Sequence, residues 1–327
     1  MAIDVGISAL LSPMILFFIL GSFAGLVRSD LNVPDAMGKA MSIYLMASIG
    51  LKGGINVADA GVSAQFAAAL AAGVGLSLLL PVPAFGLLQK LGGLDRTNAA
   101  AIAAHYGSVS VVTFVTGSEI LKALSMPPAG YMVAVMAAME TPAIIIGLLL
   151  ARKALASVPS MPKSSPTTSM WHESLLNGSV VLLLGSFLIG LIVGKDGAAP
   201  VLPVFETGFR GVLCLFLLDM GLIAARRLRE TRNLTWRLVG LGIALPVLQG
   251  FIGVTLGTAI GLDVPTTAIL GILAASASYI AVPAVMRMSL PQADPGLSLG
   301  MALAVSFPFN VTLGIPLYIT LASRIGA

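Results

Sequence analysis

One acidic residue lies in the middle of an apolar stretch of the chain. Glu140 stands in the segment METPAIIIG, directly before a threonine and a proline. Carboxylate and hydroxyl oxygens, together with a backbone carbonyl that proline leaves without its usual donor, are hard ligands that suit Na⁺ or a proton relay. A second apolar stretch, VSFPFNV, offers similar oxygens at Ser306 and Asn310. We predict an ion site at Glu140; the alternative is a protonated, hydrogen-bonded glutamate inside packed protein.

Two other apolar stretches are interrupted by small polar residues. The interrupting residues are Gly107, Ser108, Ser110 and Thr113 in HYGSVSVVTF, and Ser276, Ser278 and Pro283 in AASASYIAVPAV. Glycine and small hydroxyl side chains let an ion approach the backbone, and two facing half-helix N-termini would direct positive dipole ends at an anion. Because neither stretch carries Arg or Lys in its middle, we expect a small, singly charged anion. Alternatively, these residues only allow close helix packing.

The overall composition indicates that these stretches lie in a membrane. Of the 327 residues, 57% are hydrophobic and 10% are charged, with 18 Lys or Arg against 14 Asp or Glu. Soluble domains carry roughly a quarter charged residues. The mean hydropathy is +1.00, and the pI of about 9.4 is consistent with basic loops at a membrane face. We predict an all-α polytopic membrane protein, which excludes a soluble enzyme or a nucleic-acid-binding protein.

Ten apolar runs of the length that a membrane-spanning helix needs account for most of the chain. They fall at roughly 7–27, 36–54, 63–88, 97–117, 129–151, 174–194, 204–225, 237–261, 265–286 and 296–322. A polar stretch containing VPSMPKSSPTTS separates the first five from the last five. We therefore divide the chain into a first five-helix repeat (1–152), a cytoplasmic linker (153–173) and a second five-helix repeat (174–327).

The two halves also correspond in sequence. The matching pairs are SIGLKGG (48–54) with DMGLIAA (219–225), AHYGSVSVV (104–112) with ASYIAVPAV (277–285), and Pro142 with Pro308, at offsets of 171, 173 and 166 positions. Three near-constant offsets in the same order favour an internal duplication over chance similarity. Since an odd number of spans per repeat forces opposite orientations, we predict an inverted repeat in which spans 4 and 9 are broken and cross.

The distribution of basic residues predicts the orientation in the membrane. The loops after the odd-numbered spans carry 13 of the 18 basic residues, namely Arg28, Lys39, Lys90, Arg96, Arg152, Lys153, Lys163, Arg226, Arg227, Arg229, Arg232, Arg237 and Arg287. The positive-inside rule makes that side cytoplasmic, so both termini should lie outside the cytoplasm. The cluster from Arg226 to Arg237 is most simply a topology anchor, with a regulatory docking surface as the alternative.

The remaining polar residues give less specific signals. Asp219 lies near the cytoplasmic end of its run, and its sequence context leaves ion binding open. His105 borders a break without a ligand-spaced partner, so we expect a packed, hydrogen-bonded side chain, and we expect Arg210 to extend toward the membrane surface. HExxH and Walker motifs do not occur in the chain, so we predict a non-enzymatic protein driven by an ion gradient or by a separate subunit.

Three stretches resemble the sodium-dependent bicarbonate transporter family known from cyanobacteria: NAAAIAAHYGSVSVVTF (98–114), METPAIIIGLLLARK (139–153) and MSIYLMASIGLKGG (41–54). The resemblance implies a trimeric sodium–bicarbonate symporter of the plasma membrane (the bacterial inner membrane). Its core domain would move against its gate domain in an elevator-type mechanism, each domain drawing on both repeats. Na⁺ would be the coupling ion, and no cofactor is implied.

The resemblance also implies site residues. The bicarbonate site would comprise Gly107, Ser108, Val109, Ser110, Ser276, Ala277 and Ser278. The sodium site would comprise Glu140, Ser306, Asn310, Ser110 and Thr113. Cyanobacterial members have a longer region between spans 5 and 6 and are inhibited by a nucleotide-sensing PII-like protein, so the short linker here puts that partner in doubt.

Two other functions remain compatible with the sequence. A sodium–proton antiporter, or another sodium-coupled small-anion symporter, could be built on a similar inverted-repeat frame. A membrane sensor that binds a small anion and signals through the basic loop at 226–237 is a different class, and it would show saturable binding without net flux.

Overall fold

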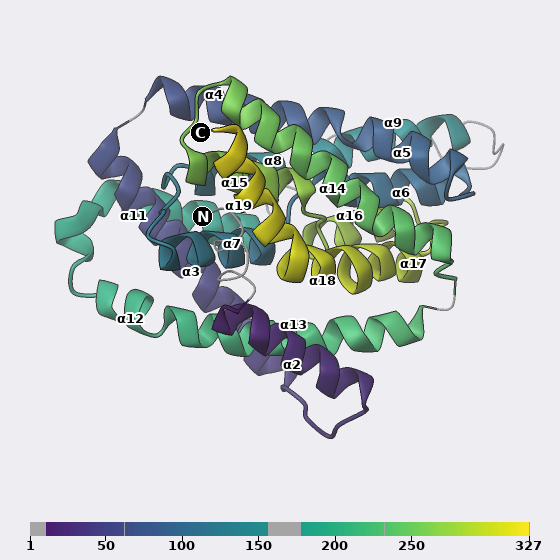
Figure 1. Ribbon diagram of the computed structural model, residues 1–327, viewed down its shortest axis with the longest axis horizontal. Helices are drawn as coiled ribbons and strands as arrows, with labels where there is room; N and C mark the ends of the chain where they lie inside the picture. The colour runs from purple at the N-terminus through teal and green to yellow at the C-terminus, as the bar shows by residue number, and fades with distance from the viewer. Residues whose placement is uncertain (1–10, 62, 156–177, 232, 327) are drawn as a thin grey trace.

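The computed structural model describes residues 11–61, 63–155, 178–231 and 233–326, and within these ranges the regular secondary structure is entirely helical (Figure 1). The helices of the first half are α2 (Pro13–Leu26), α3 (Asp35–Ala60), α4 (Ala64–Leu79), α5 (Pro81–Lys90), α6 (Arg96–Gly107), α7 (Val111–Ala123), α8 (Met132–Met139) and α9 (Pro142–Leu155). Those of the second half are α11 (Gly178–Ala198), α12 (Leu202–Thr207), α13 (Phe209–Glu230), α14 (Trp236–Ala259), α15 (Val264–Ala275), α16 (Ala281–Ser289), α17 (Pro295–Leu299), the π-helix η1 (Gly300–Ser306), α18 (Phe307–Phe309), the π-helix η2 (Asn310–Gly314) and α19 (Ile315–Ile325).

Parts of the sequence predictions fall outside these ranges. Residues 156–173 of the predicted linker lie outside the described residues, as do residues 1–10 and 327 at the two chain ends. The predicted placement of the termini, the basic residues at 163 and 232, and the first residues of the first and sixth runs therefore stay predictions.

Within the described residues, six helical segments are long and apolar enough to cross a membrane. They are Ala64–Lys90, Arg96–Ala123, Met132–Ala151, Val181–Ala198, Trp236–Ala259 and Pro295–Ile325. Pro13–Leu26 and Val264–Ala275 are apolar but shorter. The predicted all-α membrane protein is confirmed at this level, and the count of ten spans stays a prediction.

Aspartate side chains determine where the two central helices begin. Asp95 accepts the backbone N–H groups of Thr97 and Asn98 at 2.9 and 3.0 Å at the start of α6, and Asp263 accepts that of Thr266 at 3.1 Å at the start of α15. Such caps satisfy amides that have no partner within the first turn. Partial burial raises the pKa of Asp95, but the hydrogen bonds from Asn98 and Thr97 outweigh it, and the pKa lies below its ordinary value.

Four helices form what we term the lateral group: α2 packs along α13, α3 packs along α11, and α13 also contacts α3. In Figure 1 the pair α2 and α13 lies along the lower edge. Glycines allow the close approach, because a Cβ at Gly54 would overlap the carbonyl oxygen of Phe187 in α11, and one at Gly221 would overlap that of Phe18 in α2. Small residues at such contacts are typical of helix pairs in membranes.

The other long helices form a central group around α6 and α15. α14 packs on α15, α9 and α5 pack on α6, and α4 packs on α8. The backbone from Ala99 to Gly107 in α6 and from Thr266 to Ala275 in α15 consists entirely of buried residues. These two helices thus form the middle of the molecule, enclosed by the rest of the group.

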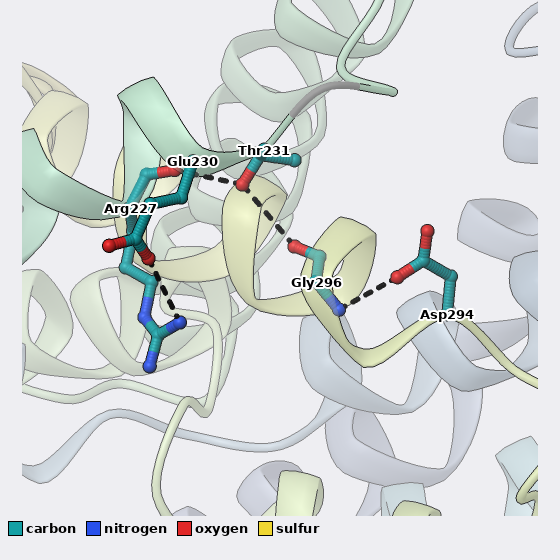
Figure 2. Close-up of polar contacts among 5 residues, drawn as sticks. All are labelled: Arg227, Glu230, Thr231, Asp294 and Gly296. Atoms are coloured by element: carbon teal, nitrogen blue, oxygen red, sulfur yellow. Dashed lines mark hydrogen bonds and ion pairs between the residues drawn. The ribbon is translucent and has the colours of Figure 1, made fainter.

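Several loops gather at one end of the molecule, on the right of Figure 1 where α13 ends and α17 begins. The Asn98 side chain accepts the backbone N–H of Asp294 at 2.7 Å, and the Asn233 amide donates to the Asp294 carboxylate at 3.2 Å. Figure 2 shows the neighbouring contact, in which the Thr231 hydroxyl approaches the Gly296 carbonyl oxygen at 3.5 Å while Asp294 caps α17. Three of the loops that sequence analysis placed on the cytoplasmic side, those after the third, seventh and ninth runs, therefore meet at one end.

Candidate functional site

Two helices are broken at the positions where small polar residues interrupt the apolar sequence. α6 ends at Gly107 and α7 begins at Val111, and α15 ends at Ala275 before α16 begins at Ala281. Both first halves have 12 residues, an aspartate N-cap and a serine C-cap in extended conformation, Ser108 and Ser276. The N-caps, the last residues and the C-caps of α6 and α15 all lie 168 positions apart. Ser108 therefore corresponds to Ser276, whereas the sequence match predicted an offset of 173 positions.

Hydrogen bonds join the two breaks directly. The backbone N–H of Ser278 donates to the carbonyl oxygen of His105 at 2.9 Å, and Nδ1 of the His105 ring lies 2.5 Å from the Ser278 carbonyl oxygen. The backbone N–H of Ser110 donates to the Ser276 hydroxyl at 3.0 Å. Because irregular backbone at membrane depth must satisfy its polar groups within the protein, this reciprocal bonding explains how both chains cross there.

The two second half-helices begin differently. The Ser110 side chain caps α7 by accepting the backbone N–H and the hydroxyl of Thr113 at 3.2 and 3.0 Å. α16 has Ile280 at its N-cap, with no side-chain cap bond, and Pro283 in its first turn. Among the described residues, the amides of Val111, Val112, Ala281 and Val282 have no hydrogen-bond partner. Both helix starts can therefore donate N–H groups to a ligand.

Glu140 occupies a third break, between α8 and α9. The Ser77 hydroxyl spans this break, donating to the Met139 carbonyl oxygen at 2.6 Å and accepting the Ala143 N–H at 3.1 Å. The Ser108 hydroxyl donates to the Glu140 carbonyl oxygen at 2.9 Å, which ties this break to the end of α6. Glu140 is 5% exposed, and no described residue forms a hydrogen bond or ion pair with its carboxylate. A buried carboxylate in this state needs a proton or a cation.

A small cavity, which we term the crossing cavity, joins Glu140 to both breaks. Its lining residues are Val109, Ser110, Val111, Glu140, Ser278, Tyr279 and Ile280. Its volume is about 10 Å³, the space of about one water molecule. One carboxylate, three hydroxyl-bearing residues and the starts of two half-helices thus surround a common space. Of the residues predicted for the two ions, the structure brings Val109, Ser110, Ser278 and Glu140 to it.

The other predicted site residues lie close by but do not line the crossing cavity. Gly107 packs where a Cβ would overlap the Pro81 ring, and Ser276, which accepts from Ser110, also donates to the Leu273 carbonyl oxygen at 2.8 Å. Ser108 and Thr113 have the partners described above, and Ala277 is buried. Through these contacts the residues stabilise the backbone at the two breaks in this conformation.

Ser306 and Asn310 are engaged with protein partners. The Ser306 hydroxyl donates to the Gly242 carbonyl oxygen at 2.5 Å and lies 2.6 Å from the Tyr106 hydroxyl. The Asn310 amide donates to the carbonyl oxygen of Ala275, the last residue of α15, at 2.8 Å, and its oxygen accepts the Tyr318 hydroxyl at 3.2 Å. Asn310 therefore stabilises the end of α15 at the second break, and it does not line the crossing cavity with Glu140.

Sequence reasoning missed two residues of this region. Ser77 was not singled out, because an isolated serine in an apolar helix gives no signal until the break it spans is known. Tyr279 lies within the quoted segment, and its buried hydroxyl is turned toward Ser110 without meeting hydrogen-bond geometry to any described group. An unpartnered buried hydroxyl beside an uncompensated carboxylate indicates a place where a ligand can bind.

The structure also shows the surroundings of the residues whose roles sequence analysis left undecided. His105 is 1% exposed and hydrogen-bonded, as predicted, and its Nε2 has no partner among the described groups although it borders a second cavity of about 110 Å³ near α17. Asp219 is buried opposite Gly38. The Arg210 side chain is 58% exposed, yet its Nε donates to Glu119 at 3.1 Å. Neither Asp219 nor Arg210 contributes to the crossing cavity.

A family comparison agrees with the resemblance found in the sequence. The model of the Na⁺-dependent bicarbonate transporter superfamily matches residues 13–323. A search of curated proteins found no match. The matched range contains all three helix breaks and the crossing cavity, and it covers nearly the whole chain. The protein therefore belongs to the Na⁺-dependent bicarbonate transporter superfamily.

Proposed function

We propose that this protein imports bicarbonate together with Na⁺, and that both ions bind at the crossing cavity. The observation that carries this proposal is the pairing of opposite chemistries in one space. Among the described residues the carboxylate of Glu140 has no partner, and it faces two half-helix starts whose first amides are also unpartnered there. The carboxylate suits a cation, and the amides with the Ser110 and Ser278 hydroxyls suit a small oxyanion.

The same arrangement favours coupled binding of the two ions. With Glu140 ionised and no cation present, its negative charge repels an anion at the neighbouring amides, and little solvent is present to screen the repulsion. Na⁺ beside Glu140 removes that repulsion and adds an attraction. Each ion then raises the affinity for the other, as thermodynamic linkage requires. Transport of one Na⁺ per bicarbonate would be electroneutral, and a second Na⁺ would add about 2.3 kcal/mol per 100 mV of membrane potential.

The ion site requires the cavity to enlarge. About 10 Å³ accommodates one water-sized particle but not bicarbonate. The helices around it can rearrange where α-helical hydrogen bonding is interrupted, at the three breaks, or replaced by another pattern, in the π-helical segments η1 and η2. We therefore assign this conformation to a closed state of the transport cycle.

The fold is consistent with ten spans arranged as two inverted repeats. Gly50 and Gly221, which correspond in the sequence match, each pack against the first helix of the opposite half: Gly50 on Leu183 in α11, and Gly221 on Phe18 in α2. The lateral group then contains spans 1, 2, 6 and 7, and the central group contains the rest. We propose an elevator-type mechanism in which the central group carries the ions past the lateral group, and this division of the helices supports it.

The remaining features of the proposal rest on the family and on loop charge. The end where the basic loops meet would face the cytoplasm, with both termini on the other side of a bacterial inner membrane. A trimer is expected from the resemblance. The short linker does not favour control by a PII-like protein.

The experiment that tests this function is uptake of labelled bicarbonate by proteoliposomes with Na⁺ outside, compared with K⁺ outside. We expect saturable uptake that requires Na⁺, and uptake that is undiminished in K⁺ would contradict symport. Proton flux on adding Na⁺ without bicarbonate would instead identify an antiporter. Saturable binding of bicarbonate without any net flux would identify a sensor.

A further inference from the structure

A third cavity lies between the lateral and central groups, at the opposite end of α7 from the crossing cavity. It has a volume of about 50 Å³, several times the space of one water molecule. Among its lining residues are Lys52 of α3, Phe209 of α13, and Ser118, Glu119 and Lys122 of α7. We term it the lysine cavity.

The charges around the lysine cavity are unequal in number. Both carboxylate oxygens of Glu119 are already used, since Oε1 accepts from the Lys122 ammonium at 2.8 Å and Oε2 accepts from Arg210 at 3.1 Å. Lys52 has no carboxylate within ion-pair distance among the described residues, and its ammonium instead lies 4.7 Å from the centre of the Phe209 ring. The exposed carboxylate of Glu206 also interacts with Lys52 without forming an ion pair. Three cations therefore stand against two carboxylates, of which one is buried, and an excess of positive charge remains.

An unsatisfied hydroxyl faces the same space. Ser118 is 8% exposed, it lines the cavity, and its hydroxyl has no hydrogen-bond partner among the described groups. Buried polar atoms of this kind are normally satisfied by protein, water or a ligand. The groups still available at the lysine cavity are thus the Lys52 ammonium, the Ser118 hydroxyl and the remaining Lys122 protons, all of which can donate to acceptor oxygens.

The lysine cavity and the crossing cavity lie along one face of α7. Val111 lines the crossing cavity, while Val115, Ser118 and Lys122 line the lysine cavity. Positions spaced four, three and four residues apart share a helix face. Ser118 follows the Ser110 cap by eight residues, a rise of about 12 Å. The two cavities therefore lie about two helical turns apart on one face of α7.

We propose that the lysine cavity is a second, sodium-independent binding site for a small singly charged oxyanion such as bicarbonate. Its role as the first stop of the transported anion rests on the proposed function and orientation, which put this end of α7 outside the cytoplasm. The binding itself does not depend on them.

The test is binding of ¹³C-labelled bicarbonate to the purified full-length protein in choline buffer without Na⁺, followed by NMR line broadening. We expect broadening in the wild type that is lost in Lys52→Gln and retained in Lys52→Arg. It should also persist in Lys39→Gln, which removes an exposed lysine from the other end of α3, and in Glu140→Gln, which alters only the crossing cavity. Absence of broadening in the wild type, or its persistence in Lys52→Gln, would overturn the proposal.

Uptake kinetics separate this proposal from the function itself. Lys52→Gln and Ser118→Ala should raise KM for bicarbonate on the order of threefold to tenfold, with the maximal rate unchanged, because a capture site raises local anion concentration without changing the translocation step. Lys39→Gln should leave KM unchanged. Sodium-dependent uptake with an unaltered KM in Lys52→Gln would reject the lysine site and leave the proposed function standing. Uptake by the wild type without any sodium dependence would reject the proposed function and leave the lysine site standing.

Discussion

The two broken helices are alike up to the break and unlike beyond it. α6 and α15 have the same length, start at capping aspartates and end at extended serines. α7 then starts with Ser110, whose hydroxyl is occupied by Thr113, whereas α16 starts at Ile280 without a side-chain cap. The first halves set the position of the crossing. The second halves differ chemically, so an anion between them would meet one helix start that is partly satisfied and one that is open.

Both helix starts face the carboxylate of Glu140, so we expect the largest effect from Glu140→Gln. This change keeps the shape but removes the charge, and losing one partner of a buried ion pair costs about 3–5 kcal/mol, so we expect Na⁺ affinity in uptake assays to fall by on the order of 100-fold or more. The melting temperature should hold or rise, because no described residue pairs with the wild-type carboxylate. Unchanged sodium dependence would establish instead a packed, protonated glutamate.

The next test removes one amide from the partly satisfied side. Val111→Pro deletes an N–H at the first position of α7, where proline is tolerated, and Ser110 already has the extended backbone (ψ 113°) that proline requires before it. Losing a hydrogen bond to a charged ligand costs about 1.5–3 kcal/mol, so uptake at low bicarbonate should drop by roughly tenfold or more.

The matched control for this change is Ala64→Pro, at the first position of α4, which also follows an extended serine cap. It should leave uptake unaltered. Equal uptake by Val111→Pro and the wild type would show that the α7 amide does not face the anion.

Serine-to-alanine changes on the two sides should separate stability from transport. Ser110→Ala removes an N-cap and should cost about 0.5–2 kcal/mol in the free energy of unfolding, besides raising KM for bicarbonate a few fold. The Ser278 hydroxyl has no partner among the described residues, so Ser278→Ala should raise KM similarly without lowering the melting temperature. If both variants lose the same stability, the asymmetry inferred for the two helix starts is wrong.

The smallest effect is expected at Thr113, which sequence analysis placed in the sodium site. Its hydroxyl donates to Ser110 and does not line the crossing cavity. Thr113→Val should therefore change the half-saturating Na⁺ concentration by about twofold or less, in keeping with the modest value of one neutral hydrogen bond. A loss comparable to that of Glu140→Gln would return Thr113 to the list of sodium ligands.

Sequence analysis located the breaks and Glu140 because polar residues at membrane depth are rare and stand out against an apolar background. It identified Ser110 and Ser278 for the same reason. It could not tell which polar residues face the cavity: Ser306 and Asn310 have suitable oxygens, yet both are hydrogen-bonded to backbone and tyrosine groups of other helices.

The predicted alignment of the two halves was less accurate than the predicted positions of the breaks. Matching aromatic and serine letters gave an offset of 173, whereas the helix caps Asp95 and Asp263 lie 168 positions apart. The caps determine where a helix starts, and hence where its backbone can stop, while similar letters can recur on either side of a break. Contacts such as the one between Ser77 and Met139 join residues 62 positions apart, and periodicity within a segment carries no information about them.

The central claim is that Na⁺ at Glu140 prepares the crossing cavity for bicarbonate. Its most direct test is equilibrium binding of labelled bicarbonate to the purified protein in Na⁺ and in K⁺, for the wild type and for Glu140→Gln. We predict that Na⁺ adds one saturable bicarbonate per wild-type chain and adds none in Glu140→Gln. An equal Na⁺-dependent increment in both proteins would contradict the claim.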